Sequence, residues 1–210
     1  MGGEIIRQVE TMEEYKKNRR KVCLDDGTVW ILYRGEARKF QLKEGMIVTE
    51  DLYDQIAHEV IGKRAIKRAM HLLEKMDRTE ANLREKLKQS EYPDEAIDGA
   101  IAYVKSYHYL DDARYAKNYI RCYQNSRSRK RLMLDLLRKG IAKQTIEQAF
   151  GEEYEADETE MIRSLLRKKA YDPSNADEKE RRRVYAFLLR KGFRSEDVLR
   201  VMKCSDYLTE

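Results

Sequence analysis

The chain contains few of the residues on which disulfide-linked or metal-bound scaffolds depend. Its 210 residues include three cysteines and two prolines. Cys23, Cys122 and Cys204 are far apart and odd in number, and none belongs to a Cys-x-x-Cys pair. Because disulfide frameworks use even sets of cysteines and zinc sites use close pairs, we expect three reduced thiols and no structural zinc.

Long hydrophobic runs are also missing from the sequence. No segment approaches the roughly 18 consecutive apolar residues that a membrane span needs. Residues 1–10 lack the apolar stretch of a signal peptide. We therefore expect a cytoplasmic protein that does not enter a membrane.

Patterns of catalytic or ligand-binding residues are equally scarce. Among the three histidines only His108 has acidic neighbours that could suggest a set of metal ligands, Asp111 and Asp112, and these two carboxylates also fit the start of a helix. The chain has no phosphate-binding glycine loop and no Ser-His-Asp or Cys-His set with supporting context. The sequence thus predicts a protein that is not an enzyme, with no catalytic residue, no metal and no cofactor.

The beginning of the chain has the chemistry of β-strands. Residues 21–24 and 28–33 are apolar or β-branched runs around an Asp-Asp-Gly turn that ends at Gly27, which is a strong hairpin signal. Residues 38–42 are a further candidate strand, and Thr49 is a candidate N-cap for a helix that follows. We predict a small β-rich module joined to a linking helix.

From about residue 62 onward the apolar spacing becomes helical and the chain repeats itself. Five positions of one segment match five in the next at a constant offset of 49, and these match a third set at an offset of 52. The sequence Leu-Leu-Arg-Lys-Gly occurs at 136–140 and again at 188–192. The matching positions are Leu83, Leu87, Tyr92, Ile97 and Ile101, then Leu132, Leu136, Ile141, Ile146 and Phe150, then Val184, Leu188, Phe193, Val198 and Met202.

Each repeat is predicted to form three helices, the second of which ends at a glycine such as Gly140. Three short helices cannot enclose a core alone, so neighbouring repeats must stack to bury their apolar faces. We therefore expect a mainly α protein in which tandem three-helix repeats form an elongated curved array behind the β-rich module. The expected divisions are 1–60 for the N-terminal module, then 61–110, 111–156 and 157–210 for the three repeats.

The basic residues gather in the middle of the chain. The net charge is +5, but residues 61–151 carry +8 while both flanks are slightly acidic. Arg127-Ser128-Arg129-Lys130-Arg131 is the densest cluster, at the expected start of a helix, where cations oppose the helix dipole. An anionic partner would relieve this repulsion, whereas a solvated turn is the simpler alternative. The predicted nucleoprotein-binding residues are Arg121, Arg127, Arg129, Lys130, Arg131, Arg138 and Lys139.

Tyrosine is the preferred aromatic residue, with fourteen copies against four phenylalanines. Several lie beside the basic cluster, where their rings could stack on exposed bases. For Tyr115 and Tyr119 the helical spacing favours the core instead.

The middle of the chain resembles the RecX family of RecA regulators. The resemblance is carried by Tyr109–Ala116 (YLDDARYA), Tyr119–Arg121 (YIR) and Leu137–Ile141 (LRKGI), and it extends over about residues 62–204. It implies tandem three-helix repeats that bind along the RecA filament on single-stranded DNA. It also implies inhibition of the ATPase, strand-exchange and coprotease activities of RecA. The expected partners are thus the RecA filament and single-stranded DNA, with double-stranded DNA as a further candidate, and we expect a monomer.

Two other functions are compatible with the sequence. Leu132 to Phe150 has the helix, glycine turn and second helix of a helix-turn-helix DNA-binding protein, but the candidate recognition helix holds only Lys143 as a cation, beside Glu147. A repeat protein that binds only other proteins is the third candidate, and it would leave the charge of residues 127–131 unexplained.

Overall fold

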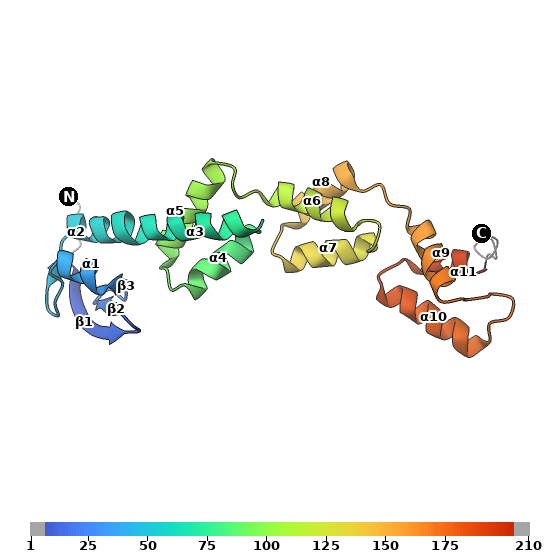
Figure 1. Cartoon of the computed structure of the whole chain (residues 1–210), viewed down its shortest axis with the longest axis horizontal. Coiled ribbons are helices and arrows are strands. Elements are labelled where there is room, and N and C mark those ends of the chain that lie inside the picture. Colours follow the sequence, from blue (N-terminus) through green and yellow to red (C-terminus); the bar gives the residue numbers. More distant parts are fainter. Residues whose placement is uncertain (1–6, 204–210) are drawn as a thin grey trace. The chain divides into compact units, whose positions relative to one another are not determined.

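The computed structural model describes residues 7–203 and divides into two compact units, Met1–Asp111 and Asp112–Glu210. In the described part, nine helices follow one another between Lys63 and Lys203 with no strand among them. Four strands, two short α-helices and a π-helical segment precede these nine helices (Figure 1). The predicted class, mainly helical with a β-rich N-terminal module, is confirmed.

The N-terminal strands form one antiparallel sheet in the order β3-β2-β1-β4. The predicted hairpin is present in it, because β2 pairs with β3 around a turn in which Gly27 has a φ of 85°. Val22 and Trp30 face each other across this hairpin and are buried. The strands are β1 (Arg7–Tyr15), β2 (Arg19–Leu24), β3 (Val29–Tyr33) and β4 (Ile47–Val48).

The strand predicted at residues 38–42 is wrong. Helix α1 (Arg34–Lys39) ends within this segment, a turn follows it, and Leu42 is buried just beyond that turn. Glu36 decides the outcome, because its carboxylate accepts a hydrogen bond from the backbone N–H of Tyr33 at 2.7 Å and forms an ion pair with Arg64 at 2.9 Å. These contacts hold the first turn of the helix, and the partner Arg64 is remote in sequence.

A continuous helical segment connects the sheet with the first repeat. It begins at α2 (Glu50–Asp54), continues through the π-helical segment η1 (Gln55–Gly62) and ends with α3 (Lys63–Lys75). Thr49 caps it as predicted, since its hydroxyl accepts a hydrogen bond from the N–H of Leu52 at 3.4 Å. The five-residue step from Ile56 to Ile61 in the π-helical segment keeps both side chains in the core of the first unit.

The predicted repeats are present as three sets of three helices. Every matching apolar position is buried except Tyr92, which is half-buried. The first set is α3, α4 (Glu80–Gln89) and α5 (Asp94–Ser106). The other sets are α6 (Asp112–Tyr123), α7 (Arg129–Arg138) and α8 (Lys143–Glu153), then α9 (Glu158–Lys168), α10 (Glu178–Arg190) and α11 (Ser195–Lys203).

A left-handed residue ends the second helix of each repeat. In the second and third repeats it is a glycine, Gly140 at a φ of 85° and Gly192 at 92°. At the matching position of the first repeat Glu91 adopts a φ of 66°. A side chain in this region costs about 1 kcal/mol or more. The Glu91 carboxylate offsets this cost by binding Lys16 at 2.7 Å and the Tyr15 hydroxyl, both next to the turn between β1 and β2.

The second and third repeats meet at Ser128, the buried N-cap of α7. Its hydroxyl donates a hydrogen bond to the carbonyl of Lys191 at 2.7 Å and accepts one from the N–H of Arg131 at 3.3 Å. Gly192 lies so close that a Cβ there would be 2.6 Å from the Ser128 hydroxyl. At this point the two repeats are joined through a buried hydroxyl and a glycine, and nearby the backbone N–H of Arg129 donates a hydrogen bond to Glu158 of the third repeat.

Within the described residues, no helix is both long and apolar enough to span a membrane. Cys23 and Cys122 are free thiols, while Cys204 lies outside the described part of the chain.

Truncation of a repeated core leucine tests the packing of the second repeat. Leu136 is fully buried, and we expect Leu136→Ala to lower the free energy of unfolding by about 2–5 kcal/mol because it leaves a cavity. Leu134→Ala on the same helix is the control, since Leu134 is exposed, and its effect should stay within about 0.5 kcal/mol. Equal effects of the two changes in urea unfolding followed by circular dichroism would contradict the packing.

Gly192→Ala tests the junction between the second and third repeats. The new Cβ would meet the Ser128 hydroxyl and place a side chain at positive φ, so we expect the unfolding free energy to fall by about 2 kcal/mol or more. Gly151→Ala is the matched control in the same unit, because a Cβ at this helical glycine meets nothing within 4 Å. That substitution should stabilise the protein by up to about 1 kcal/mol. A neutral Gly192→Ala would show that the two repeats are not held together at this point.

Candidate nucleoprotein interface

All seven predicted binding residues lie in the second repeat. Arg121 is in the last turn of α6, Arg127 is in the connection to α7, and Lys139 is the C-cap of α7. The other four, Arg129, Lys130, Arg131 and Arg138, belong to α7 itself. The structure thus brings them together on one helix pair, but it gives them different local partners.

One aspartate forms ion pairs with two of these arginines. Asp135 on α7 forms ion pairs with Arg127 at 2.9 Å and with Arg131 at 3.1 Å, and its side chain is only 11% exposed. Arg127 and Arg131 therefore compensate a nearly buried carboxylate, so part of their charge serves the fold of the repeat.

A ladder of tyrosines on α6 continues into the basic cluster. Tyr115, Tyr119 and Tyr123 follow at four-residue spacing, with ring centroids 6.3 Å and 4.7 Å apart. Arg127 extends the ladder, because its guanidinium lies 4.3 Å from the centroid of the Tyr123 ring. Tyr115 and Tyr119 pack against the core of the repeat, as predicted, whereas Tyr123 is 38% exposed. The outer end of this ladder is an aromatic surface next to a cation.

Arg129 and Lys139 also lie against aromatic rings. Arg129 is 4.6 Å from the Phe150 centroid and 5.5 Å from that of Tyr154. Lys139 is 5.5 Å from the centroid of Tyr119. Such a cation–π contact orients a charged group without neutralising it, so Arg129 can still attract an anion.

Arg121 is neutralised by a carboxylate from the last turn of α8. Its Nε and Nη2 donate to Glu153 at 3.0 Å and 2.8 Å, which is a bidentate pair. The neighbouring pair Lys117–Glu152, at 2.5 Å, ties the same two helices together. Arg121 therefore serves mainly to join α6 and α8.

Lys130 and Arg138 carry the uncompensated charge of the cluster. Both side chains are exposed on α7, and neither has a carboxylate within ion-pair distance among residues 7–203. A solvent-exposed cation without a partner gains most from an incoming phosphate, since it gives up no existing ion pair. These two residues form the free part of the candidate interface.

Two half-buried phenols at the site have raised pKa values. Burial is the main cause that raises the pKa of Tyr119, although Arg127 and Lys139 act in the opposite direction. Burial and the adjacent Glu158 raise the pKa of Tyr154 as well. The Tyr154 hydroxyl accordingly donates a hydrogen bond to Glu158 at 3.1 Å.

Three structural partners of the cluster, Asp135, Glu153 and Ser128, are absent from the sequence-based prediction. Asp135 could have been found, because it follows Arg131 by four residues on one helix, which is the spacing of a helical ion pair. Glu153 has no such signal, since it is distant from Arg121 in sequence. Among the described residues, no three His, Cys, Asp or Glu side chains gather as a metal site would require.

Comparison with known proteins shows three adjacent matches that follow the three helical sets. Residues 65–111 match the first three-helix domain of RecX, residues 111–149 the second, and residues 156–202 the third. Regulatory protein RecX from Caldanaerobacter subterraneus subsp. tengcongensis is 30% identical over 159 residues, which cover 75% of this chain and 78% of the relative. The chain belongs to the RecX family.

Other RecX proteins match nearly the whole chain, including the sheet. Regulatory protein RecX from Clostridium beijerinckii is 27% identical over 203 residues, covering 94% of this chain and 95% of the relative. A crystal structure of a regulatory protein RecX superposes with a TM-score of 0.63 at 23% identity and covers 93% of this chain and 98% of that one. The RecX structure from Lactobacillus salivarius has a TM-score of 0.60 at 22% identity, over 68% and 95% of the two chains. The structural likeness supports the fold.

The ion pairs of Asp135 distinguish the cations that stabilise the fold from those that have no carboxylate partner. We expect Arg127→Gln to lower the unfolding free energy by about 1–2 kcal/mol, because it removes a charged hydrogen bond to a nearly buried carboxylate. Lys130→Gln, the matched control in the same cluster, should change it by less than about 0.5 kcal/mol. Chemical denaturation of both variants measures the difference. If Arg127→Gln were as neutral as Lys130→Gln, the ion pair would have no structural role.

Proposed function

We propose that this protein is a non-enzymatic regulator of the RecA recombinase. In this proposal it binds the RecA filament on single-stranded DNA and lowers the ATPase, strand-exchange and coprotease activities of the filament. Membership of the RecX family, through three matched domains, is the observation that carries the proposal. The direction of the effect follows the RecX resemblance of the sequence.

The basic face of the second repeat supports a partner that contains nucleic acid. Lys130 and Arg138 offer charge that no described carboxylate compensates, and Arg129 and Lys139 add oriented cations. The half-exposed Tyr123, with Arg127 at its ring, is suited to stack on an unpaired base. Unpaired bases are accessible in single strands and not in a duplex, which favours single-stranded DNA over double-stranded DNA as the nucleic-acid component.

The helix-turn-helix alternative is disfavoured by the charge of α8. This helix would be the recognition helix, and its one cation, Lys143, lies 3.6 Å from Glu147 in an ion pair. In the first repeat the equivalent helix α5 begins with Asp94 and Glu95. Helices of this kind would enter a DNA groove with carboxylates facing phosphates, which costs free energy.

Binding to RecA-coated and to bare single strands separates the filament regulator from the DNA-binding protein. We expect the protein to bind coated strands at least about tenfold more tightly, because a nucleoprotein filament offers protein contacts in addition to phosphates. Substoichiometric protein should lower the DNA-dependent ATPase rate of RecA. Fluorescence anisotropy with a labelled oligonucleotide and a coupled ATPase assay measure the two effects. Equal affinity for both targets, together with an unchanged ATPase rate, would instead favour a plain DNA-binding protein.

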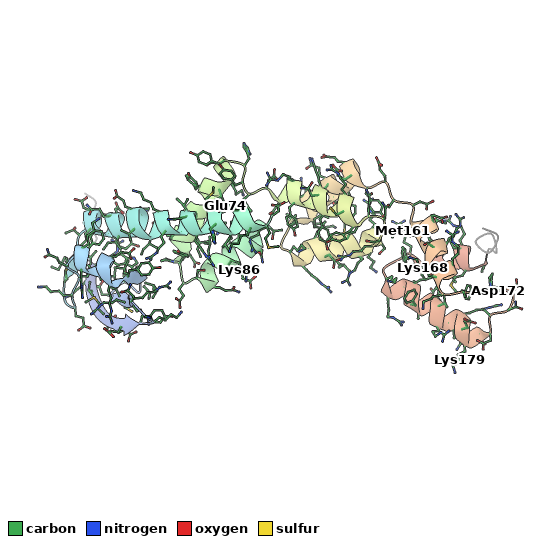
Figure 2. All side chains as sticks on the ribbon, in the orientation of Figure 1. Glu74, Lys86, Met161, Lys168, Asp172 and Lys179 are labelled. Carbon is green, nitrogen blue, oxygen red and sulfur yellow. The ribbon has the colours of Figure 1, made fainter. Side chains whose placement is uncertain are left out.

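The double substitution Lys130→Gln and Arg138→Gln tests the free cations within this experiment. It should weaken binding to bare strands and make the plot of log affinity against log salt shallower by about 0.7 for each phosphate that the variant no longer binds. Lys179→Gln is the control, because Figure 2 shows Lys179 projecting from α10 into solvent, and no ion pair of the described residues involves it. An unchanged salt slope would mean that the cluster is only a solvated surface.

A further inference from the structure

A second cationic pocket lies in the first unit, where the sheet meets the first repeat. It has a volume of about 360 Å³. Its walls come from β2, β3, the end of η1, α3 and the turn after α4. The charged residues of its lining are Lys16, Arg19, Arg64, Arg68 and Glu91.

The cations of this pocket exceed its carboxylates. Lys16 and Arg19 share the single carboxylate of Glu91, at 2.7 Å and 3.7 Å. Arg64 is held by Glu36 at 2.9 Å and donates to the carbonyl of Ile31 at 2.6 Å. Arg68 has no carboxylate within ion-pair distance among residues 7–203. Two carboxylates therefore balance four cations, and the pocket keeps a net positive charge.

Arg64 and Arg68 repel each other along α3. They are four residues apart on one helix, where like charges are destabilising. The fixed guanidinium of Arg64 leaves Arg68 as the adjustable donor, and an anion between them would bind both. Arginine recognises phosphate oxygens through paired N–H groups, which a single chloride ion cannot match.

An aromatic ring lines the pocket beside the arginines. Tyr33 is 38% exposed, and its centroid lies 5.1 Å from the guanidinium of Arg64 and 5.3 Å from that of Arg19. An open ring beside paired arginines suits a phosphate that carries a planar base nearby.

The second unit has a cationic pocket at the equivalent loop. Arg190, Lys191 and Phe193 of the third repeat match Gln89, Ser90 and Tyr92 of the first through the constant offsets. These three residues line a pocket of about 360 Å³ together with Ser126, Arg127, Ser128 and Arg131 of the second repeat. In both places the turn that ends the second helix of a repeat forms a basic pocket with the element that precedes that repeat.

We propose that the pocket between the sheet and the first repeat binds a backbone phosphate of a single-stranded nucleic acid, through Arg68, Arg64 and Arg19. The neighbouring base stacks on Tyr33. This site lies outside the basic cluster of the second repeat, and it deepens the proposed function by assigning the N-terminal module a direct role in holding the strand. The proposal rests on the proposed function for its choice of nucleic acid over other phosphates.

Arg68→Gln in the full-length chain tests the site, with Lys67→Gln as the matched control. Lys67 is exposed, adjacent on α3 and absent from the pocket lining, so both changes remove one positive charge from the same turn. We expect Arg68→Gln to weaken binding of a bare single-stranded oligonucleotide about tenfold, as removal of a charge-assisted hydrogen bond predicts. The salt slope should become shallower by about 0.7. Lys67→Gln should match the unmodified protein in both.

Three further measurements decide between the possible occupants. Arg68→Lys should retain the salt slope while reducing the affinity in part, because lysine keeps the charge without the paired donors. Inorganic phosphate should displace the oligonucleotide better than chloride does at equal ionic strength, because its oxygens fit the paired N–H donors. It should do so only at a concentration far above that of the oligonucleotide, because it has no base to stack on Tyr33. Thermal unfolding of the Arg68 variants should match that of Lys67→Gln, because Arg68 is exposed and has no carboxylate partner in residues 7–203.

The proposal is overturned by any of three results. These are an oligonucleotide affinity of Arg68→Gln equal to that of the control, displacement of the oligonucleotide by an equal concentration of inorganic phosphate, and weaker binding that is seen only with RecA-coated strands. The last result would identify a carboxylate of the filament as the occupant. The primary measurement uses bare DNA and is independent of RecA. If the protein did not change the ATPase rate of RecA, the proposed regulation would be refuted, but the proposal of a phosphate-binding pocket would not.

Discussion

The left-handed turn that ends the second helix of each repeat is the constraint on which the other features depend. It stops the helix and places its last carbonyls at a surface that the preceding element can approach. In the third repeat the approach is so close that only a glycine, Gly192, fits beside the Ser128 hydroxyl. In the first repeat the same turn carries Glu91, whose carboxylate reaches Lys16 and Tyr15 of the sheet. The sheet thus meets the first repeat at the position where the second repeat meets the third.

The sheet contacts the first repeat as one repeat contacts the next, which gives the N-terminal module the structural role of a cap. Terminal units of a repeat protein expose a face that the interior units bury, and they need a cap. The sheet covers that face of the first repeat and shares its apolar core, in which Trp30 and Ile56 lie with Leu87. Because the cap also supplies Arg19 and Tyr33, the junction that completes the fold of the first unit also forms a basic pocket.

Charge at the second repeat has two separate uses, and composition alone cannot divide them. Arg121, Arg127 and Arg131 are bound to carboxylates that join helices or lie nearly buried. Lys130 and Arg138 have no such partner in the described residues and are available to an anion. A dense run of cations therefore contains residues that stabilise the fold through ion pairs and residues that are free to bind an anion. The carboxylates that lie nearby in the tertiary structure decide to which group each cation belongs.

The sequence by itself determined the repeats, the helix ends and the hairpin, because each depends on neighbours a few residues away. Helical spacing of Leu132 and Leu136, a glycine after the helix and an Asp-Gly turn are local signals. The helix at residues 34–39, the strand β1 and the partners of Arg121 were decided only by the tertiary structure. The helix at residues 34–39 depends on the ion pair between Glu36 and the remote Arg64. Strand β1 has little apolar alternation beyond Val9, so its strand conformation follows from its pairing with β2 and β4. The pocket at Arg68 was likewise decided only by the tertiary structure, because its lining residues are far apart in sequence and come together where the sheet packs on the first repeat.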